Sequence, residues 1–600
     1  MKRLFNLIVL LMLVSVSAMA DDSYTDVDNI QKFIETISAN PSAHIRLTAD
    51  INLSDTHTGS LSGVTFKGVI DGKGTDKDGY DIVYSIIGLG KNTAVAPLFK
   101  DMSSATLQNL CIRSFRLVDE SDDNLGVLGR TVSECHFTNV VFSDISVFCD
   151  EDYAGAIAGQ AFNCNFRGVK VLGCDISVDG QYAGGFVGSS QNCFFYDCIN
   201  SMSSGVFADG SWGDAYAGGF VGKSDKDTFQ YCANLSLVCG DDDRVGGITG
   251  YSDHSNFWQC SNSGMVVQGD EEDYLASRAE LMKKIQEYQQ GSENHLKIMF
   301  ATLFGSVAEW TALGLAEFGL LLGGVALGVS LVTVGGIIFA VGFAATIIEG
   351  IIFFADAHDE LGGICGYALG GSFKECANYS QCATRDMYVG GIVGQTWGKS
   401  SDRCVIETCL NQGSISGYEH VGGIVGCCEY TDVSNCLNTG PLSSYCKIEN
   451  DIYGIDAGVN TFSNNYFKAK KYNVNSNEFK AVTEEQLNSG QVAWWLNGGN
   501  GTSDAPWRQT LSGDNKDRYP PLDNSHDIVT EENLSGRYTV STADELMAFA
   551  AEVNKGAHPS YIVYIGSDID MKDRVWTPIG TEDNQFVGLC FGGGHTISNL

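Results

Sequence analysis

Small and apolar residues recur along the chain in one fixed order. A glycine pair, an apolar residue, a variable residue and a further glycine form a core that we write GGφxG, where φ is apolar. The second glycine of this core falls at Gly185, Gly219, Gly247, Gly363, Gly391 and Gly423. Weaker copies precede them, with Gly126 and Ala156 in the same place. The intervals are 28 to 34 residues, apart from one of 116, and such a period is typical of stacked repeats that bury their apolar faces against one another.

A second pattern, φxxCxN, follows each full copy of the core. Its cysteines are Cys198, Cys232, Cys260, Cys376, Cys409 and Cys436, and its asparagines are Asn200, Asn234, Asn262, Asn378, Asn411 and Asn438. In a flat strand the apolar residue and the cysteine would face opposite ways, so we expect a corner between them. The asparagine suits that corner because it tolerates left-handed conformations, and the glycine pair supplies unusual backbone angles and close approach. Three short strands and three corners per repeat predict one coil of a parallel β-helix, which we expect to be right-handed.

The GGφxG core followed by NCxN, as in Asn435 to Asn438, resembles the GLUG motif of bacterial exported β-helix proteins. That group includes large surface proteins of Bacteroidetes and the IgA-cleaving metallopeptidases. The resemblance covers roughly residues 107 to 445 apart from an insertion, and it implies a β-helical scaffold with a role at the cell surface. The metallopeptidases carry their chemistry in a separate HExxH zinc domain, and no HExxH occurs in these 600 residues. The resemblance therefore does not imply proteolysis.

The interval of 116 residues indicates an insertion of roughly 88 residues within one turn. Its first part, 274–290, has the pattern of a charged amphipathic helix. Residues 298–354 are almost wholly apolar and contain GxxxG pairs, which allow membrane helices to pack closely. We predict a helical hairpin that inserts into a membrane with both ends on one side, whereas the alternative is a helical pair packed on the β-helix wall. The hairpin glycines are Gly319, Gly323, Gly324, Gly328, Gly335 and Gly336.

Apolar spacing also predicts helices at both ends of the repeats. Residues 26–40 carry Ile30, Phe33 and Ile37 at helical spacing, so we expect a short helix that covers the open end of the stack. A capping box at 483–486 predicts a helix that runs to Gly498. Residues 540–600 then repeat the opening sequence, with a helix at 542–553, which predicts the start of a second module whose unpaired edge would continue beyond Leu600.

These patterns divide the chain into six predicted parts. They are a signal peptide (1–20), the first part of the β-helix with its cap (21–269), the helical insertion (270–360), the second part of the β-helix (361–470), a capping segment (471–535) and the start of a second module (536–600). Residues 1–20 have the basic start, apolar run and Ala18-Met19-Ala20 end of a cleaved secretory signal. Position 21 is Asp and not Cys, which disfavours a lipid anchor.

Composition narrows the classes of partner. A formal net charge of -36 argues against nucleic acid, which requires a basic surface. The chain has 20 cysteines, and an exported protein would ordinarily join them in disulfides. Because six of them hold one place in the repeat, we expect a ladder of inward free thiols instead, with Cys427 and Cys428 as the pair most suited to a disulfide.

No nucleophile motif and no repeated acidic cluster stands out, so we predict no catalytic residue, cofactor site or metal site. We expect an exported structural or adhesive protein of the cell envelope, held at a membrane by residues 298–354, with lipid and a host surface or polysaccharide as partners. One alternative is a membrane-inserting effector that shields its hairpin until it meets a bilayer. A second is a β-helix that binds or degrades polysaccharide.

Overall fold

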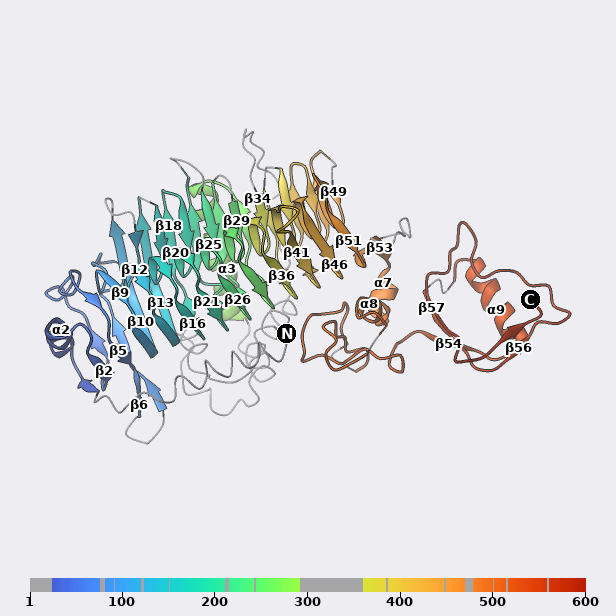
Figure 1. Ribbon diagram of the computed structural model, residues 1–600, viewed down its shortest axis with the longest axis horizontal. Coiled ribbons are helices and arrows are strands. Elements are labelled where there is room, and N and C mark those ends of the chain that lie inside the picture. The colour runs from blue at the N-terminus through green and yellow to red at the C-terminus, as the bar shows by residue number, and fades with distance from the viewer. Residues whose placement is uncertain are drawn as a thin grey trace.

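The computed structural model describes residues 24–75, 81–90, 92–119, 124–150, 152–210, 215–241, 244–291, 360–384, 387–446, 449–469, 479–499, 501–513, 516–557 and 560–600. Short strands wind into an elongated stack, with the order along the chain preserved along the stack (Figure 1). The strands of successive turns pair in parallel in three sheets of nine, eleven and 31 strands, called sheets 1, 2 and 3 here. This arrangement confirms the parallel β-helix.

Sheet 1 contains β11 (Asn124–Leu125), β14 (Tyr153–Gly155), β19 (Tyr182–Gly184), β24 (Tyr216–Gly218), β29 (Arg244–Gly246), β34 (Glu360–Gly362), β39 (Tyr388–Gly390), β44 (Val421–Gly422) and β49 (Glu449–Asn450). Sheet 2 contains β4 (Thr65–Phe66), β9 (Asp101–Ser103), β12 (Gly129–Ser133), β15 (Ala158–Phe162), β20 (Val187–Gln191), β25 (Val221–Asp225), β30 (Thr249–Asp253), β35 (Cys365–Leu369), β40 (Val393–Trp397), β45 (Val425–Glu429) and β50 (Tyr453–Asp456).

Sheet 3 begins with β1 (Thr25–Val27), β2 (His44–Leu47), β3 (Ile51–Asn52), β5 (Val69–Asp71), β8 (Ser85–Ile87), β10 (Thr106–Asp119) and β13 (His136–Cys149), and then divides into three rows. The first row is β16 (Asn165–Arg167), β21 (Phe194–Tyr196), β26 (Thr228–Gln230), β31 (Asn256–Trp258), β36 (Ser372–Lys374), β41 (Cys404–Glu407), β46 (Thr431–Ser434) and β51 (Thr461–Ser463). The second is β17 (Lys170–Leu172), β22 (Ile199–Asn200), β27 (Ala233–Asn234), β32 (Ser261–Asn262), β37 (Ala377–Asn378), β42 (Leu410–Asn411), β47 (Leu437–Asn438), β52 (Asn465–Lys468) and β53 (Phe479–Val482). The third is β18 (Asp175–Val178), β23 (Gly205–Ala208), β28 (Leu237–Gly240), β33 (Val266–Gln268), β38 (Cys382–Ala383), β43 (Ile415–Gly417) and β48 (Leu442–Ser444).

The corner within the φxxCxN pattern lies between the apolar residue and the cysteine, as predicted, but the asparagine does not form it: the corner residue is the one before the cysteine. Asp197, Tyr231, Gln259, Glu375, Thr408 and Asn435 occupy this place, and each has a positive φ of 52° to 57°. A single left-handed residue between two extended segments turns the chain so that the apolar residue and the cysteine both face inward. The asparagine lies beyond the corner, on a strand of the second row, and its side chain is buried.

The glycine pair also works differently from the prediction. It lies at the bend between sheets 1 and 2, so the GGφxG core is not one strand: β19 ends at Gly184 and β20 begins at Val187. None of the six register glycines has a positive φ. Instead, a methyl group on Gly247 would lie 2.1 Å from the carbonyl oxygen of Gly363 in the next turn. Close approach between turns, not an unusual backbone angle, is therefore the reason for glycine here.

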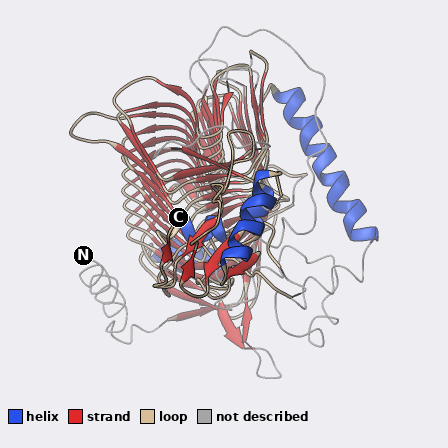
Figure 2. Cartoon of the chain, turned by 90° about the vertical axis from the view of Figure 1, so that its right-hand side faces the viewer, coloured by secondary structure: helices blue, strands red, loops and turns tan. Residues whose placement is uncertain are grey.

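The stack continues without interruption across the insertion. Residues 116 apart in sequence are direct neighbours: Arg244 pairs with Glu360, Tyr251 with Tyr367 and Phe257 with Phe373. The helix α3 (Glu271–Gly291), expected at 274–290, leaves the stack directly after β33 and stands beside it (Figure 2). Tyr274 stacks on Phe207 with ring centroids 5.2 Å apart, and Arg278 forms an ion pair with Asp175 of β18.

A small residue makes room for α3. A Cβ at Gly205 of β23 would lie 2.4 Å from the hydroxyl oxygen of Tyr274, whereas the next turn carries Leu237 at the same register position. The glycine thus forms a notch in the wall that admits the first two turns of the helix.

Two predicted segments lie outside the described residues, so both stay predictions. They are the apolar hairpin at 298–354, with its six glycines, and the signal at 1–20. Within the part that the structure describes, no helix has the length and hydropathy required to cross a bilayer.

The cap predicted at the start is present as α2 (Ile30–Ala39), which buries Phe33 and Ile37. The capping box at Thr483 is also present, but the helix predicted from it is divided into α7 (Glu484–Asn488) and α8 (Gln491–Leu496). Gly490, with a φ of 87°, separates them, because a left-handed residue cannot continue an α-helix.

The early turns also carry a two-stranded antiparallel hairpin, formed by β6 (Lys73–Thr75) and β7 (Asp81–Val83).

The opening element order recurs after the stack. The helix α9 (Ala543–Asn554) follows β54 (Arg537–Val540), and β54 pairs with β55 (Ile562–Ile565) as β1 pairs with β2. Further along, β55 pairs with β57 (Leu589–Phe591), and β56 (Ile569–Asp570) with β58 (Ile597–Ser598), as β2 does with β5 and β3 with β8. The same strand-helix-strand unit is therefore built twice.

Candidate binding surface

The repeated asparagines form a hydrogen-bonded ladder inside the stack. Asn234 Nδ2 donates to Asn262 Oδ1, and the same bond joins Asn262 to Asn378, Asn378 to Asn411 and Asn411 to Asn438, each at 2.9 Å. The register glycines pack against this ladder, since a Cβ at Gly363 would lie 2.6 Å from the side-chain carbonyl carbon of Asn378. The two sequence patterns recur together because each glycine leaves the space that the asparagine of its own turn fills.

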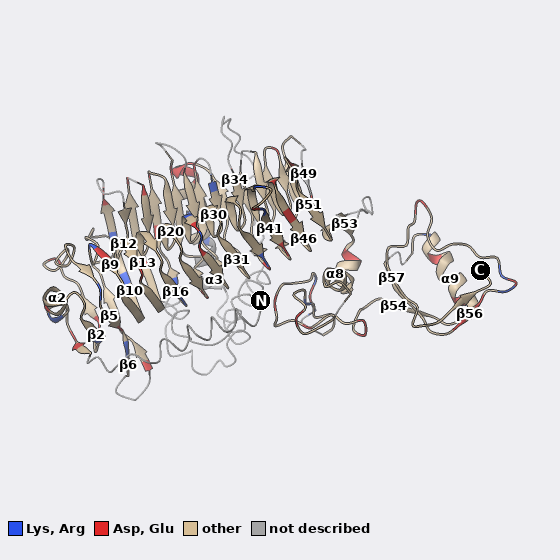
Figure 3. Cartoon of the chain, in the orientation of Figure 1, with Lys and Arg blue, Asp and Glu red and all other residues tan. Residues whose placement is uncertain are grey.

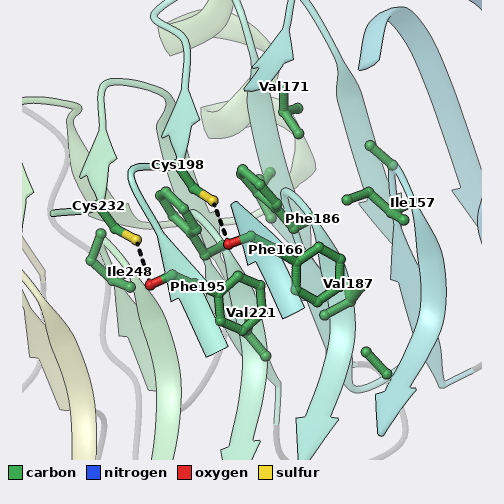
Figure 4. Close-up of a cluster of buried hydrophobic side chains, with 14 of the residues drawn as sticks. Ile157, Phe166, Val171, Phe186, Val187, Phe195, Cys198, Val221, Cys232 and Ile248 are labelled. Carbon is green, nitrogen blue, oxygen red and sulfur yellow. Dashed lines mark hydrogen bonds between the residues drawn. The ribbon is translucent and has the colours of Figure 1, made fainter. Parts of the chain in front are cut away.

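The repeated cysteines are buried free thiols, and no disulfide joins any of the 20 cysteines, Cys427 and Cys428 included. Each thiol of the six donates to the carbonyl oxygen of the φ residue in the preceding turn, for example Cys198 to Phe166 and Cys232 to Phe195 at 3.5 and 3.6 Å (Figure 4). Four of the six φ residues are phenylalanines, and with Phe137 and Phe166 of the preceding turns they form a stack of rings whose centroids are 4.6 to 4.9 Å apart at near-parallel angles. These repeat-core side chains are buried and contact one another, so they are not accessible to a ligand.

One buried position carries a carboxyl group. Asp227 occupies the place that Cys193 holds one turn earlier, and its side chain accepts from Ser190 and Ser224 hydroxyls at 2.5 and 2.6 Å and from the backbone N–H of Cys193 at 2.6 Å. Desolvation raises the pKa of Asp227 to about 7, and these three donors oppose that rise. With no accessible surface, this carboxyl cannot meet a substrate, but it does couple the stability of the stack to pH.

The outer side of sheets 1 and 2 carries a row of tyrosines that we call the tyrosine strip. Its members are Tyr153, Tyr182, Tyr216, Arg244, Glu360 and Tyr388 on sheet 1, and Lys223, Tyr251 and Tyr367 on sheet 2. Neighbours Ala183, Val245 and Leu361 on the same strands point into the core. The strip therefore lies on the face of these strands that is turned away from the core.

Contacts between the two sheets join these side chains into one surface. The Lys223 ammonium lies 5.4 Å from the ring centroid of Tyr182 and 5.8 Å from that of Tyr251. The Arg244 guanidinium lies over Tyr216, Tyr251 and Tyr367 at 5.0, 5.6 and 4.7 Å. Cations over aromatic faces are attracted by the ring quadrupole, so the two basic groups are held between the two rows.

Of the two cations in the strip, Arg244 has a carboxylate partner and Lys223 has none among the described residues. Arg244 Nε lies 3.2 Å from Glu360 Oε2, and its Nη1 donates to the Tyr216 hydroxyl at 2.6 Å. Burial raises the pKa of Tyr367 to about 12, so its hydroxyl keeps its proton at neutral pH. No described carboxylate lies within ion-pair distance of Lys223, although Lys226 in the same turn pairs with Asp225 at 2.8 Å. Figure 3 shows that charged residues are sparse along the strands of the stack.

Sequence reasoning missed this surface. Its signal is a tyrosine three residues before the register position, which is an alanine for Tyr153 and a glycine for Tyr182, Tyr216 and Tyr388. The partner residues Lys223, Tyr251 and Tyr367 have no fixed relation to that signal, because only the bend between the sheets brings them beside it. Within the described ranges, no group of three or more histidine, cysteine or acidic side chains is placed so that it could hold a metal ion.

Comparisons with known proteins add little to this geometry. No family model matches the chain, and no curated protein matches it. Two solved structures are similar: one called "IgA1 Protease", with 11% identity and a TM-score of 0.25, and "a putative immunoglobulin A1 protease from Bacteroides ovatus", with 12% identity and a TM-score of 0.23. The matches cover 79% and 84% of this chain, and 24% and 94% of the other two. The chain thus spans about a quarter of the first structure's length, and at these scores neither likeness says anything about its activity.

Proposed function

We propose that the protein is an exported structural scaffold that adheres to an extended ligand through the tyrosine strip. The stack supplies the rigid part, since its thiol, asparagine and phenylalanine ladders run from turn to turn and fill its interior. The strip supplies the adhesive part. The export signal predicted at 1–20 and the resemblance of the GGφxG core to exported β-helix proteins support a place at the cell surface.

The observation that carries this proposal is the excess of tyrosine and cationic side chains on a face where the fold does not require them. At the same register positions other turns carry Asn124, Gln160, Ser189 or Gln395, and the strands pair there in the same way. Aromatic rings with a polar end and a few placed charges are typical of binding surfaces. A ligand that runs along the stack would meet one side chain per turn, every ~4.8 Å.

Adhesion of the full chain tests the proposal. Beads coated with the protein are washed over an epithelial cell layer, and retention is compared with that of a variant in which Lys223, Tyr251 and Tyr367 are alanine. We expect retention of the variant to fall to that of uncoated beads. A control variant carries Lys226→Ala and Tyr445→Ala, which remove an exposed cation and a tyrosine that is 70% exposed and follows β48 of sheet 3. Equal retention of the two variants would contradict the proposal.

A further inference from the structure

The ring planes of the strip decide which part of each tyrosine a ligand can touch. Tyr153 and Tyr182 stack with centroids 4.5 Å apart at 11°, and Tyr251 and Tyr367 with centroids 5.5 Å apart at 6°. Faces within such stacks are covered by the neighbouring ring. Tyr182 and Tyr216 are only 8% and 7% exposed, so little of either ring is available for apolar contact with a ligand. The strip is therefore a hydrogen-bonding surface more than an apolar one.

A ligand that suits this surface carries hydrogen-bonding groups along its whole length. The phenol hydroxyls recur with the turns, and Gln395 and Ser189 extend the same row at either end. Glycans carry hydroxyl groups on every ring, and a phenol can both donate to and accept from them. An extended polypeptide would instead need an open strand edge for its backbone, and sheets 1 and 2 are paired on both sides at these turns.

Lys223 adds a charge requirement. Its ammonium is held over two rings and has no carboxylate partner among the described residues, in contrast to Arg244, which Glu360 balances. A net charge of -36 opposes a densely charged polyanion, but single carboxylates set among neutral sugars escape most of that repulsion, since salt screens charges beyond ~8 Å. Charge complementarity at Lys223 thus favours a ligand with isolated acidic groups.

We propose that the tyrosine strip binds a carboxylated glycan, whose carboxylate pairs with Lys223 and whose neighbouring sugar hydroxyls bond to the hydroxyls of Tyr251 and Tyr367. This inference rests on the proposed adhesive function and names its ligand class. The carboxylate can come from a sialic acid at a chain end or from a uronic acid within a chain. Both present the same group to Lys223.

Matched pairs of glycans test the charge requirement on the full chain by calorimetry. Sialyllactose is compared with its methyl ester, and a neutral oligosaccharide that carries a single glucuronic acid is compared with the methyl ester of that acid. Each ester has the same rings without the charge. We expect the acidic member of at least one pair to bind at least tenfold more tightly and to weaken as salt is added. The pair that responds identifies the source of the carboxylate. Equal binding of both members in both pairs would overturn the ligand class.

Variants locate the contact. Lys223→Gln should lose about tenfold or more in affinity for the acidic glycan, because hydrogen bonds between two charged groups are stronger than those to a neutral amide. Lys223→Arg keeps the charge and should retain most of the affinity. Lys226→Gln removes the same charge from the same turn but leaves the strip intact, so it should bind like the unchanged protein. Equal affinities of the two glutamine variants would place the carboxylate elsewhere and overturn the inference.

The outcomes for ligand and function are separable. If no glycan binds while the triple alanine variant still loses adhesion to cells, the ligand class is wrong and the adhesive function stands. If glycans do not bind and adhesion is unchanged as well, both proposals fall. Thermal unfolding of each variant followed by circular dichroism shows that the stack is intact, so that loss of binding is not loss of fold.

Discussion

Asp227 makes the stability of the stack depend on pH in a direction opposite to that of most surface carboxylates. Desolvation raises its pKa from 3.8 to about 7. The folded state therefore holds a proton that the unfolded chain releases. The stabilisation from this proton is complete below pH ~3.8, and it is lost progressively as the pH rises to about 7, where the folded state must carry a buried charge.

The size of the effect follows from the shift. A difference of roughly three pKa units at 1.36 kcal/mol per unit gives an upper limit of about 4 kcal/mol between the two ends of this range. Asp227→Asn removes the charge and keeps the hydrogen bonds, because its oxygen accepts from Cys193 N–H and its amide donates to the Ser190 and Ser224 hydroxyls, which rotate to accept. We expect this variant to be more stable than the unchanged protein by about 2–4 kcal/mol at pH 8, and to lose that advantage at pH 4.

Urea unfolding of both proteins at intervals between pH 4 and pH 9 provides the measurement. Asp225→Asn is the control, because that carboxylate belongs to the same turn but lies at the surface beside Lys226. Its stability difference from the unchanged protein should vary little with pH. A constant difference between Asp227→Asn and the unchanged protein across this range would refute the reasoning. Lower stability of the variant at pH 8 would refute it equally, since it would show that the three donors require a charged acceptor.

Three further predictions concern the packing of the stack. Gly205→Leu should release α3 from the wall while the strands stay paired, since Leu237 fits the same register position one turn later. The mobility of a fluorescent probe on α3 should increase, and unchanged probe mobility would mean that no notch exists. Asn378→Ala should lower the free energy of unfolding, measured in urea, by about 2–4 kcal/mol, because it leaves two buried ladder partners unpaired. This loss should exceed that of Asn438→Ala at the end of the ladder, and equal losses would argue against a continuous ladder. Thr408→Gly should raise stability by about 1 kcal/mol, because a β-branched residue is strained at a φ of 57°, and a loss of stability would show that its side chain is needed in the corner.

The amino-acid sequence alone determined the repeat, its period and the parallel β-helix. It did so because each turn must present the same small and apolar groups to its neighbours, so that Gly247, Cys260 and Asn262 recur in one order. The same pattern located the insertion and showed that its flanking turns are neighbours. Local signals sufficed for α2, α3 and α9, whose apolar spacing and caps are read within a dozen or so residues.

The corner residues could not be found that way. Tyr231, Glu375 and Thr408 share a left-handed conformation but no side-chain property, because the stack imposes the corner and the local sequence only tolerates it. The role of the asparagines was likewise hidden, since a ladder of amides exists only between turns. The tyrosine strip depends on tertiary structure most of all: Tyr182 and Lys223 lie on different sheets and different turns, and only the bend at the glycine pair brings the ammonium over the ring. Sequence sets what each turn repeats, whereas the surface presented to a ligand arises from residues that the winding of the chain places side by side.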